Sequence, residues 1–90
     1  MARQDVFISH STADAEVAKL VVAQIEAHGI DCWYAKRDVP PGADWPTEIV
    51  HAIDVAKVMV LIFSVSSNSS PQVRNEVVLA NGRGVRMVTF

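Results

Sequence analysis

Glu76 is the residue whose type and position point most directly to chemistry. It falls in a helical pattern in which Val73, Val77 and Ala80 recur every three or four residues, so its carboxylate is expected on or beside the apolar face. Burying a carboxylate is costly unless it is paired or hydrogen-bonded, and such groups gather at functional sites. The alternative is a helix rotated to use Val78, with Glu76 in solvent or paired with an arginine.

Two short polar segments have the side chains to bind a ligand. The first is Ser9–His10–Ser11–Thr12, and the second runs from Ser64 to Ser70 and holds five serines in seven residues. Their hydroxyls suit a sugar or a phosphate, and His10 could bind a phosphate or a polar ring. The simpler interpretation is that these residues only cap helices and close turns.

A turn-rich loop, expected over residues 35–44, brings a third group of candidates. Trp45 follows it beside the helix-capping Asp44 and could either stack on a ligand ring or pack the loop down. Arg37 and Asp38 form either a local ion pair or part of an interface with a partner. Trp33 lies within an expected strand and is assigned to the core.

Composition narrows the classes of function. The chain has 90 residues, half of them apolar, and a net charge of −2, so one ordered domain without a dominant basic patch for nucleic acid is expected. The single cysteine, Cys32, excludes an internal disulfide and a cysteine-based zinc site, and no cluster has the spacing of metal ligands. The longest apolar run, Val58 to Phe63, is far shorter than the roughly 20 residues of a membrane span. We therefore expect a cytoplasmic protein that binds neither nucleic acid nor a membrane.

Apolar segments alternate with helical patterns along the chain. Strands are expected over residues 5–9, 30–34, 58–63 and 85–90. Helices are expected after caps at Ser11, Asp44 and Ser70. The first helix is expected to bury the stripe Val17, Leu20, Val21 and Ile25.

This alternation predicts an α/β fold, a flavodoxin-like parallel sheet of order 2-1-3-4 with helices on both faces. The first and third strands are the central ones because they are wholly apolar. Residues expected to be buried in them are Val6, Ile8, Val60 and Ile62. Ligands bind such sheets at the carboxyl ends of these strands, where the two polar segments lie.

The last strand, Val85 to Phe90, is apolar and has nothing after it. An apolar strand at the edge of a sheet invites pairing with another chain. We therefore expect residues 1–90 to be one domain truncated after its fourth strand, with a fifth strand missing, and to be marginally stable or self-associating.

Two sequence boxes resemble those of Toll/interleukin-1 receptor (TIR) domains. Residues 5–11, Asp-Val-Phe-Ile-Ser-His-Ser, are similar to the first box, and residues 37–42, Arg-Asp-Val-Pro-Pro-Gly, are similar to the second. The boxes occur in the right order around a helix, and the likeness extends over essentially the whole chain. The stretches 42–45 and 58–64 resemble bacterial members most.

This resemblance implies an activity and a set of site residues. Many TIR domains hydrolyse NAD with a glutamate on the helix after the third strand, and Glu76 is the matching position, with Gln72 where the family often has tryptophan. The residues it places around the substrate are Ser9, His10, Ser11, Trp45, Ser64 and Gln72. The loop it implies for self-association contains Arg37, Asp38, Pro41 and Gly42.

The expected function is therefore cleavage of NAD, as substrate and without a cofactor, in bacterial immune or stress signalling. One carboxylate is enough, because nicotinamide leaves as a neutral base and needs no general acid. The alternative is a non-catalytic TIR module that works by self-association. A fragment too incomplete for either role and an enzyme resembling nucleoside deoxyribosyltransferases are further options.

Overall fold

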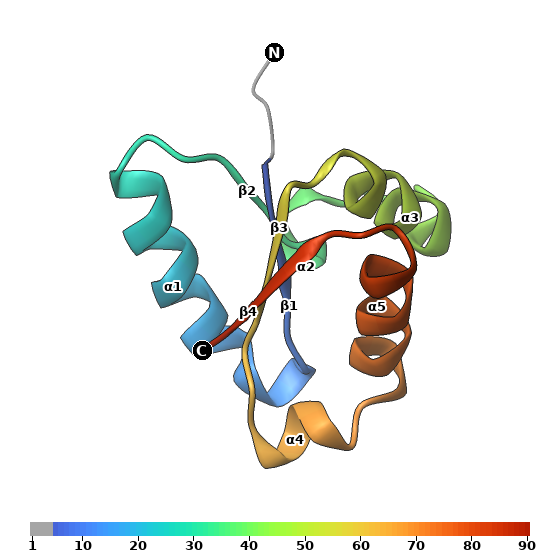
Figure 1. The fold of residues 1–90 in the computed structure, drawn as a ribbon. Helices are drawn as coiled ribbons and strands as arrows, with labels where there is room; N and C mark the ends of the chain where they lie inside the picture. The colour runs from blue at the N-terminus through green and yellow to red at the C-terminus, as the bar shows by residue number, and fades with distance from the viewer. Residues whose placement is uncertain (1–4) are drawn as a thin grey trace.

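Four short parallel strands form the sheet in the computed structural model, which describes residues 5–90 (Figure 1). The strands are β1 (Val6–Ser9), β2 (Cys32–Trp33), β3 (Val58–Leu61) and β4 (Arg86–Thr89). Their order is β2-β1-β3-β4, and each neighbouring pair is parallel. The predicted sheet and its strand order are confirmed, although each strand is shorter than expected.

The register of the strands brings their carboxyl ends to one edge of the sheet. Ser9 at the end of β1 lies beside Leu61 of β3, which in turn lies beside Thr89 of β4. The segments that follow the strands therefore begin close together, as the parallel topology requires.

Helices cover both faces of the sheet, as predicted (Figure 1). One face carries α1 (Ala15–Ala27), which follows the 3₁₀ turn η1 (Thr12–Asp14), and the other carries α3 (Trp45–Val55) and α5 (Pro71–Gly82). Two short helices, α2 (Ala35–Asp38) and α4 (Val65–Asn68), follow β2 and β3. The expected loop over residues 35–44 is therefore helical in its first turn.

Successive residues of β1 serve two apolar layers, since side chains alternate across a strand. The layer beneath α1 contains Val6, Ile8, Ala18, Val21, Val22, Cys32, Tyr34 and Ile62. The layer beneath α3 and α5 contains Phe7, Trp33, Val39, Ile49, Ala52, Ile53, Met59 and Ala80. Phe7 stacks on Trp33 with ring centroids 5.1 Å apart, which confirms Trp33 as a core residue.

The buried face predicted for α1 is confirmed at Val21 and Ile25 but wrong at Val17 and Leu20. Val17 and Leu20 are 40% and 69% exposed, whereas Ala18 is fully buried against the sheet. Residues 18, 21, 22 and 25 also fit a helical stripe and share two residues with the predicted one, so periodicity alone allowed both faces. The small side chain of Ala18 lets the helix approach the sheet, and Leu20 turns to solvent.

Of the four residues predicted to be buried in the central strands, Val60 is the exception. Val6, Ile8 and Ile62 are buried, but Val60 is only partly covered. It packs against the layer beneath α1, the only long helix on that face in the described part of the chain. One helix therefore leaves part of β3 open.

The predicted caps are confirmed at two of three helices. The Asp44 carboxylate accepts from the backbone N–H of Thr47, and the Ser70 hydroxyl accepts from that of Val73. Ser11 lies at the N-cap position of η1, but its hydroxyl makes no capping bond and donates to the carboxylate of Asp14 instead. The chain therefore enters α1 through η1.

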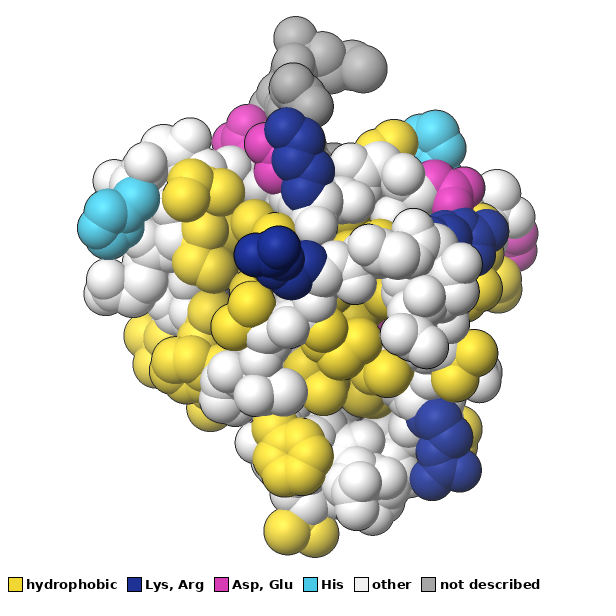
Figure 2. Space-filling model, in the orientation of Figure 1, with side chains coloured by type: hydrophobic (Ala, Val, Ile, Leu, Met, Phe, Trp, Pro, Cys, Tyr) yellow, Lys and Arg dark blue, Asp and Glu magenta, His cyan; other side chains and the backbone are white. Residues whose placement is uncertain are grey.

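Within residues 5–90, β4 pairs only with β3 and so forms an edge of the sheet. Apolar side chains gather on the face where β4 lies in front, interrupted by basic ones (Figure 2). Val88 and Phe90, at the end of the chain, are both exposed. In residues 5–90 no helix has the length and apolar character to cross a membrane.

Candidate functional site

Glu76 lies on the face of α5 that packs against the sheet. Ser70 caps the helix and Pro71 occupies its first turn, which sets the rotation of the residues that follow. Val73, three residues before Glu76, and Ala80, four after, are buried, and Glu76 itself is only 4% exposed. Val78 is 65% exposed, so the rotated alternative with Glu76 in solvent is wrong.

Two neutral side chains hold the Glu76 carboxylate. The Ser9 hydroxyl donates to Oε1 at 2.7 Å, and the Gln72 side-chain amide donates to Oε2 at 3.3 Å. Among the described residues no basic side chain forms an ion pair with it. Burial raises the pKa of Glu76 above its ordinary value, and the two hydrogen bonds act against this rise. The site therefore contains a desolvated carboxylate that forms no direct ion pair with a basic side chain of residues 5–90.

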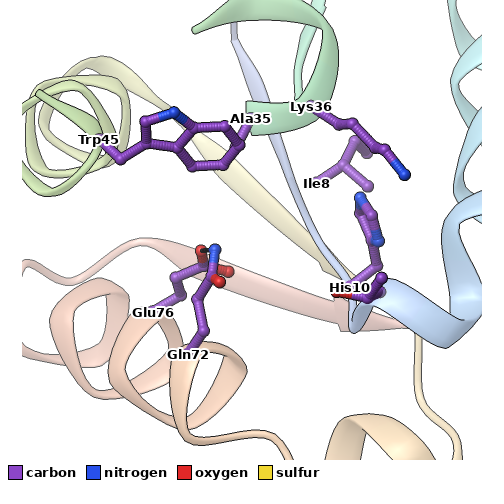
Figure 3. Close-up of a pocket in the computed structure, with 8 residues that line it drawn as sticks. Ile8, His10, Ala35, Lys36, Trp45, Gln72 and Glu76 are labelled. Carbon is purple, nitrogen blue, oxygen red and sulfur yellow. Dashed lines mark hydrogen bonds between the residues drawn. The ribbon is translucent and has the colours of Figure 1, made fainter. Parts of the chain in front are cut away.

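A pocket of about 160 Å³ opens beside this carboxylate. Figure 3 shows Glu76 and Gln72 of α5 on one side, Trp45 of α3 facing them, and His10 and Lys36 across the opening. The lining residues come from β1 and the turn after it, from η1, and from α2, α3 and α5: Ile8, His10, Thr12, Ala35, Lys36, Trp45, Gln72 and Glu76. The neutral amide of Gln72, the cation of Lys36 and the aromatic ring of Trp45 thus line one pocket with the Glu76 carboxylate.

A second, more apolar pocket of about 440 Å³ adjoins the first, between α3 and α5. Its lining residues are Trp45, Pro46, Ile49, Val50, Gln72, Asn75, Glu76 and Leu79. Trp45, Gln72 and Glu76 line both pockets, so they form the boundary between a polar and an apolar chamber. Such a pair of chambers suits a ligand with one flat apolar end and one polar end.

Three residues predicted to contact a substrate line the pocket with Glu76. Gln72 and Trp45 are exposed there, and Trp45 presents its ring to the opening. His10 Nδ1 lies 2.7 Å from the carbonyl oxygen of Ser11, which makes Nδ1 the donor, and its ring is tilted against that of Tyr34. These side chains are placed to meet a ligand, whereas their roles stay predictions.

The three serines are placed differently. Ser9 is fully buried behind Glu76, and Ser11 and Ser64 are not among the residues that line either pocket. Ser11 and Ser64 both donate hydrogen bonds to the carboxylate of Asp14, and those bonds hold the pKa of Asp14 below its ordinary value. Their hydroxyls connect the start of α4 to η1.

The serine segment also forms a local cap, as the simpler interpretation predicted. The backbone N–H of Ser67 donates to the Ser64 hydroxyl, and that of Ser64 donates to the hydroxyl of Ser67. This reciprocal pair is a capping box at the start of α4.

Lys36 is the pocket residue that sequence reasoning missed. It lies on α2, and in residues 5–90 no carboxylate forms an ion pair with it. The available signal was topological: Lys36 follows the second strand, whose carboxyl end lies at the same edge of the sheet as the pocket. Among the described residues, no group of three or more His, Cys, Asp or Glu side chains could hold a metal ion.

Arg37 and Asp38 form the local interaction that was one of the two predicted options. The Arg37 guanidinium donates to both carboxylate oxygens of Glu26 and to Asp38, and it lies 4.9 Å from the centre of the Tyr34 ring. These bonds lower the pKa of Glu26 and raise that of Arg37. The turn that contains Pro41 and Gly42 is exposed as well.

Known proteins match this chain over most of its length. The family profile described as TIR domain matches residues 6–88. The stimulator of interferon genes protein of Magallana gigas is 32% identical over 75 residues, which are 82% of this chain and 18% of that protein. The chain therefore spans less than a fifth of this curated relative.

Solved structures share the fold. The TIR domain of the Toll-related receptor TRR-2 of Hydra magnipapillata superposes with a TM-score of 0.85 at 21% identity, over 96% of this chain and 68% of that one. A metazoan TIR-STING receptor from C. gigas gives 0.83 at 28% identity, over 97% and 30% of the two chains. The same receptor in complex with 2',3'-cGAMP gives 0.80 at 29% identity, over 96% and 28%.

Proposed function

This chain belongs to the TIR domain family, and from that premise we propose that it is an NAD glycohydrolase, which cleaves the bond between nicotinamide and ribose. The observation that carries the proposal is the Glu76 carboxylate, which is buried, held by two neutral donors and placed between a polar and an apolar pocket. NAD is the substrate in this proposal, and the reaction uses no further cofactor.

The proposed chemistry needs one well-placed negative charge. As the bond between the ribose carbon and the nicotinamide nitrogen breaks, its electron pair goes to the ring, which leaves as neutral nicotinamide. Positive charge then develops on the ribose, and the buried Glu76 carboxylate stabilises it. A water oxygen bonds to the ribose carbon and loses its proton to solvent, which gives ADP-ribose.

The two pockets support an orientation for the substrate. The apolar pocket beside Trp45 and Ile49 suits the flat nicotinamide ring, and the polar pocket beside His10 and Lys36 suits the ribose and the phosphates. The reacting bond then lies over Glu76, at the boundary of the two. Gln72, His10 and Trp45 are the proposed substrate contacts.

A second candidate function is a non-catalytic module that binds other TIR domains. The exposed turn that contains Pro41 and Gly42, beside the polar pocket's α2, favours it as a contact with a neighbour. Kinship with bacterial members, a role in bacterial immunity and a cytoplasmic location stay predictions. The relatives named above are metazoan.

Nicotinamide release from NAD by the purified chain, over a range of protein concentrations, tests the proposal. Glu76→Gln keeps the shape of the side chain but removes the charge, so we expect the rate to fall by about 10²–10³. Glu16→Gln is the matched control, because Glu16 is exposed on α1 at the other face of the sheet. Circular dichroism checks that all three proteins are folded.

Two outcomes would contradict the proposal. Equal rates for the folded wild type and Glu76→Gln would remove Glu76 from catalysis. Absence of release from the folded wild type at every concentration would favour the module that acts by self-association.

A further inference from the structure

Ser9 has the position of a residue that serves Glu76 and not the substrate. It is the last residue of β1 and is fully buried, and its hydroxyl donates to Glu76 Oε1 at 2.7 Å across 67 residues of sequence. The resemblance places Ser9 among the substrate contacts. Its burial leaves the hydroxyl no open side from which a substrate could approach.

The two oxygens of Glu76 have different surroundings. Oε1 is bonded to the buried Ser9, so it points into the protein. Oε2 is bonded to Gln72, an exposed side chain that lines both pockets. Oε2 is therefore the oxygen that a ligand can reach by displacing a long, flexible amide.

We propose that Ser9 is a positioning residue, whose buried hydroxyl fixes Oε1 of Glu76 and so directs a charged Oε2 toward the substrate. The catalytic role of Ser9 rests on the function proposed above, whereas the hydrogen bond between Ser9 and Glu76 is present in the structure whatever the function. A hydroxyl that donates to a carboxylate stabilises the charged form over the protonated one.

The Ser9 hydrogen bond matters because it opposes the effect of burial on the pKa of Glu76. Desolvation favours the protonated carboxyl, and Ser9 is the stronger of the two hydrogen-bond donors that act against it. The charged or titratable groups that face Glu76 across the polar pocket are His10 at the end of β1 and Lys36 on α2. Neither α3 nor the neighbouring residues of α5 place a charged side chain in the apolar pocket.

A carboxyl titration by ¹³C NMR on the full chain tests the proposal directly. The Glu76 resonance is assigned as the one that is lost in Glu76→Gln. We expect Ser9→Ala to raise the pKa of Glu76 by about one unit, the size expected from losing one hydrogen bond to a charged group. His10 and Lys36 are present in both the wild type and Ser9→Ala, so the difference in the pKa of Glu76 between the two proteins reports on Ser9.

Ser67→Ala is the matched control. Ser67 is also a buried serine, but its hydroxyl bonds only to the backbone of Ser64, so this variant leaves the pKa of Glu76 unchanged. Ser9→Cys, which keeps a weak donor of similar shape, gives a smaller rise and replaces Ser9→Ala if that variant does not fold. An unchanged pKa of Glu76 in a folded Ser9 variant would overturn the proposal.

The rate of nicotinamide release gives a second readout. We expect the acid limb of kcat/KM in Ser9→Ala to move to higher pH by the same amount as the pKa of Glu76, with the rate recovering as the pH rises. A loss of rate that is equal at every pH would contradict the proposal. Absence of release from the wild type counts against the proposed function alone, because the titration needs no turnover.

Discussion

Both terminal nitrogens of Arg37 donate to the carboxylate of Glu26, at 2.9 Å and 3.0 Å, and this pair ties α2 to the end of α1. Arg37 is therefore held by groups of its own chain, and its side chain is 36% exposed. We expect a contact between the second box and a neighbouring molecule to include the exposed turn around Pro41 and Gly42, which has no such ion pair within residues 5–90.

Gly42 and Gly29 offer a matched test of that turn. Both have a φ of +80°, and a Cβ on either would meet no atom within 4 Å. Alanine at either position should destabilise the fold by roughly 1–2 kcal/mol, because it must adopt a left-handed conformation. We expect only Gly42→Ala to weaken self-association, measured by sedimentation velocity at several concentrations. Identical sedimentation of the two variants would exclude the turn from assembly.

Glu76 should lower the stability of the fold at neutral pH. Burial raises the pKa of Glu76 in the folded state, so the folded protein favours the protonated carboxyl. The stabilisation from this protonated form is fully present below about pH 4.5, the ordinary pKa, and is lost as the pH rises through the folded pKa. We therefore expect Glu76→Gln to be more stable than the wild type at pH 8 and to lose this advantage at pH 4. Urea unfolding at the two pH values measures the difference.

Glu16→Gln supplies the reference for this experiment, because its carboxylate is exposed on α1. If Glu76→Gln gains the same free energy of unfolding over the wild type at both pH values, the effect comes from packing and not from charge.

Lys36 should discriminate between substrates with and without phosphate. We expect Lys36→Gln to raise the KM for NAD about tenfold, which corresponds to about 1.4 kcal/mol, and to leave the KM for nicotinamide riboside unchanged. Lys57→Gln is the control, since Lys57 is exposed and directly precedes β3, at the amino ends of the strands and away from the pocket. Equal increases for the two substrates would mean that Lys36 shapes the pocket without binding phosphate.

The order of the strands could be predicted because it depends on local signals. Continuous apolar runs marked the central strands, and the alternation with helices required parallel pairing. The buried face of α1 could not be predicted in the same way, since Leu20 is more apolar than Ala18 and both fit a helical period. Close approach to the sheet selected the smaller side chain, and only the packed structure contains that information.

The candidate site also combines features that local sequence patterns predict with features that depend on tertiary contacts. Spacing within α5 allowed Glu76 on the inner face or, in a rotated helix, in solvent, and the family resemblance favoured the first. Its contact with Ser9 joins residues 67 positions apart, and Lys36 depends on a helical turn in a segment expected to be a loop. Both depend on tertiary structure that local patterns do not encode.

The single thiol of the chain lies beneath α1, on the short edge strand β2. Cys32 is 1% exposed, and desolvation raises its pKa to about 11, so almost no reactive thiolate exists at neutral pH. An alkylating reagent can reach it only when α1 or β2 moves away from the apolar layer that covers the thiol. The rate of labelling at Cys32 therefore measures local opening of this part of the fold, by α1 or by β2, without an added probe.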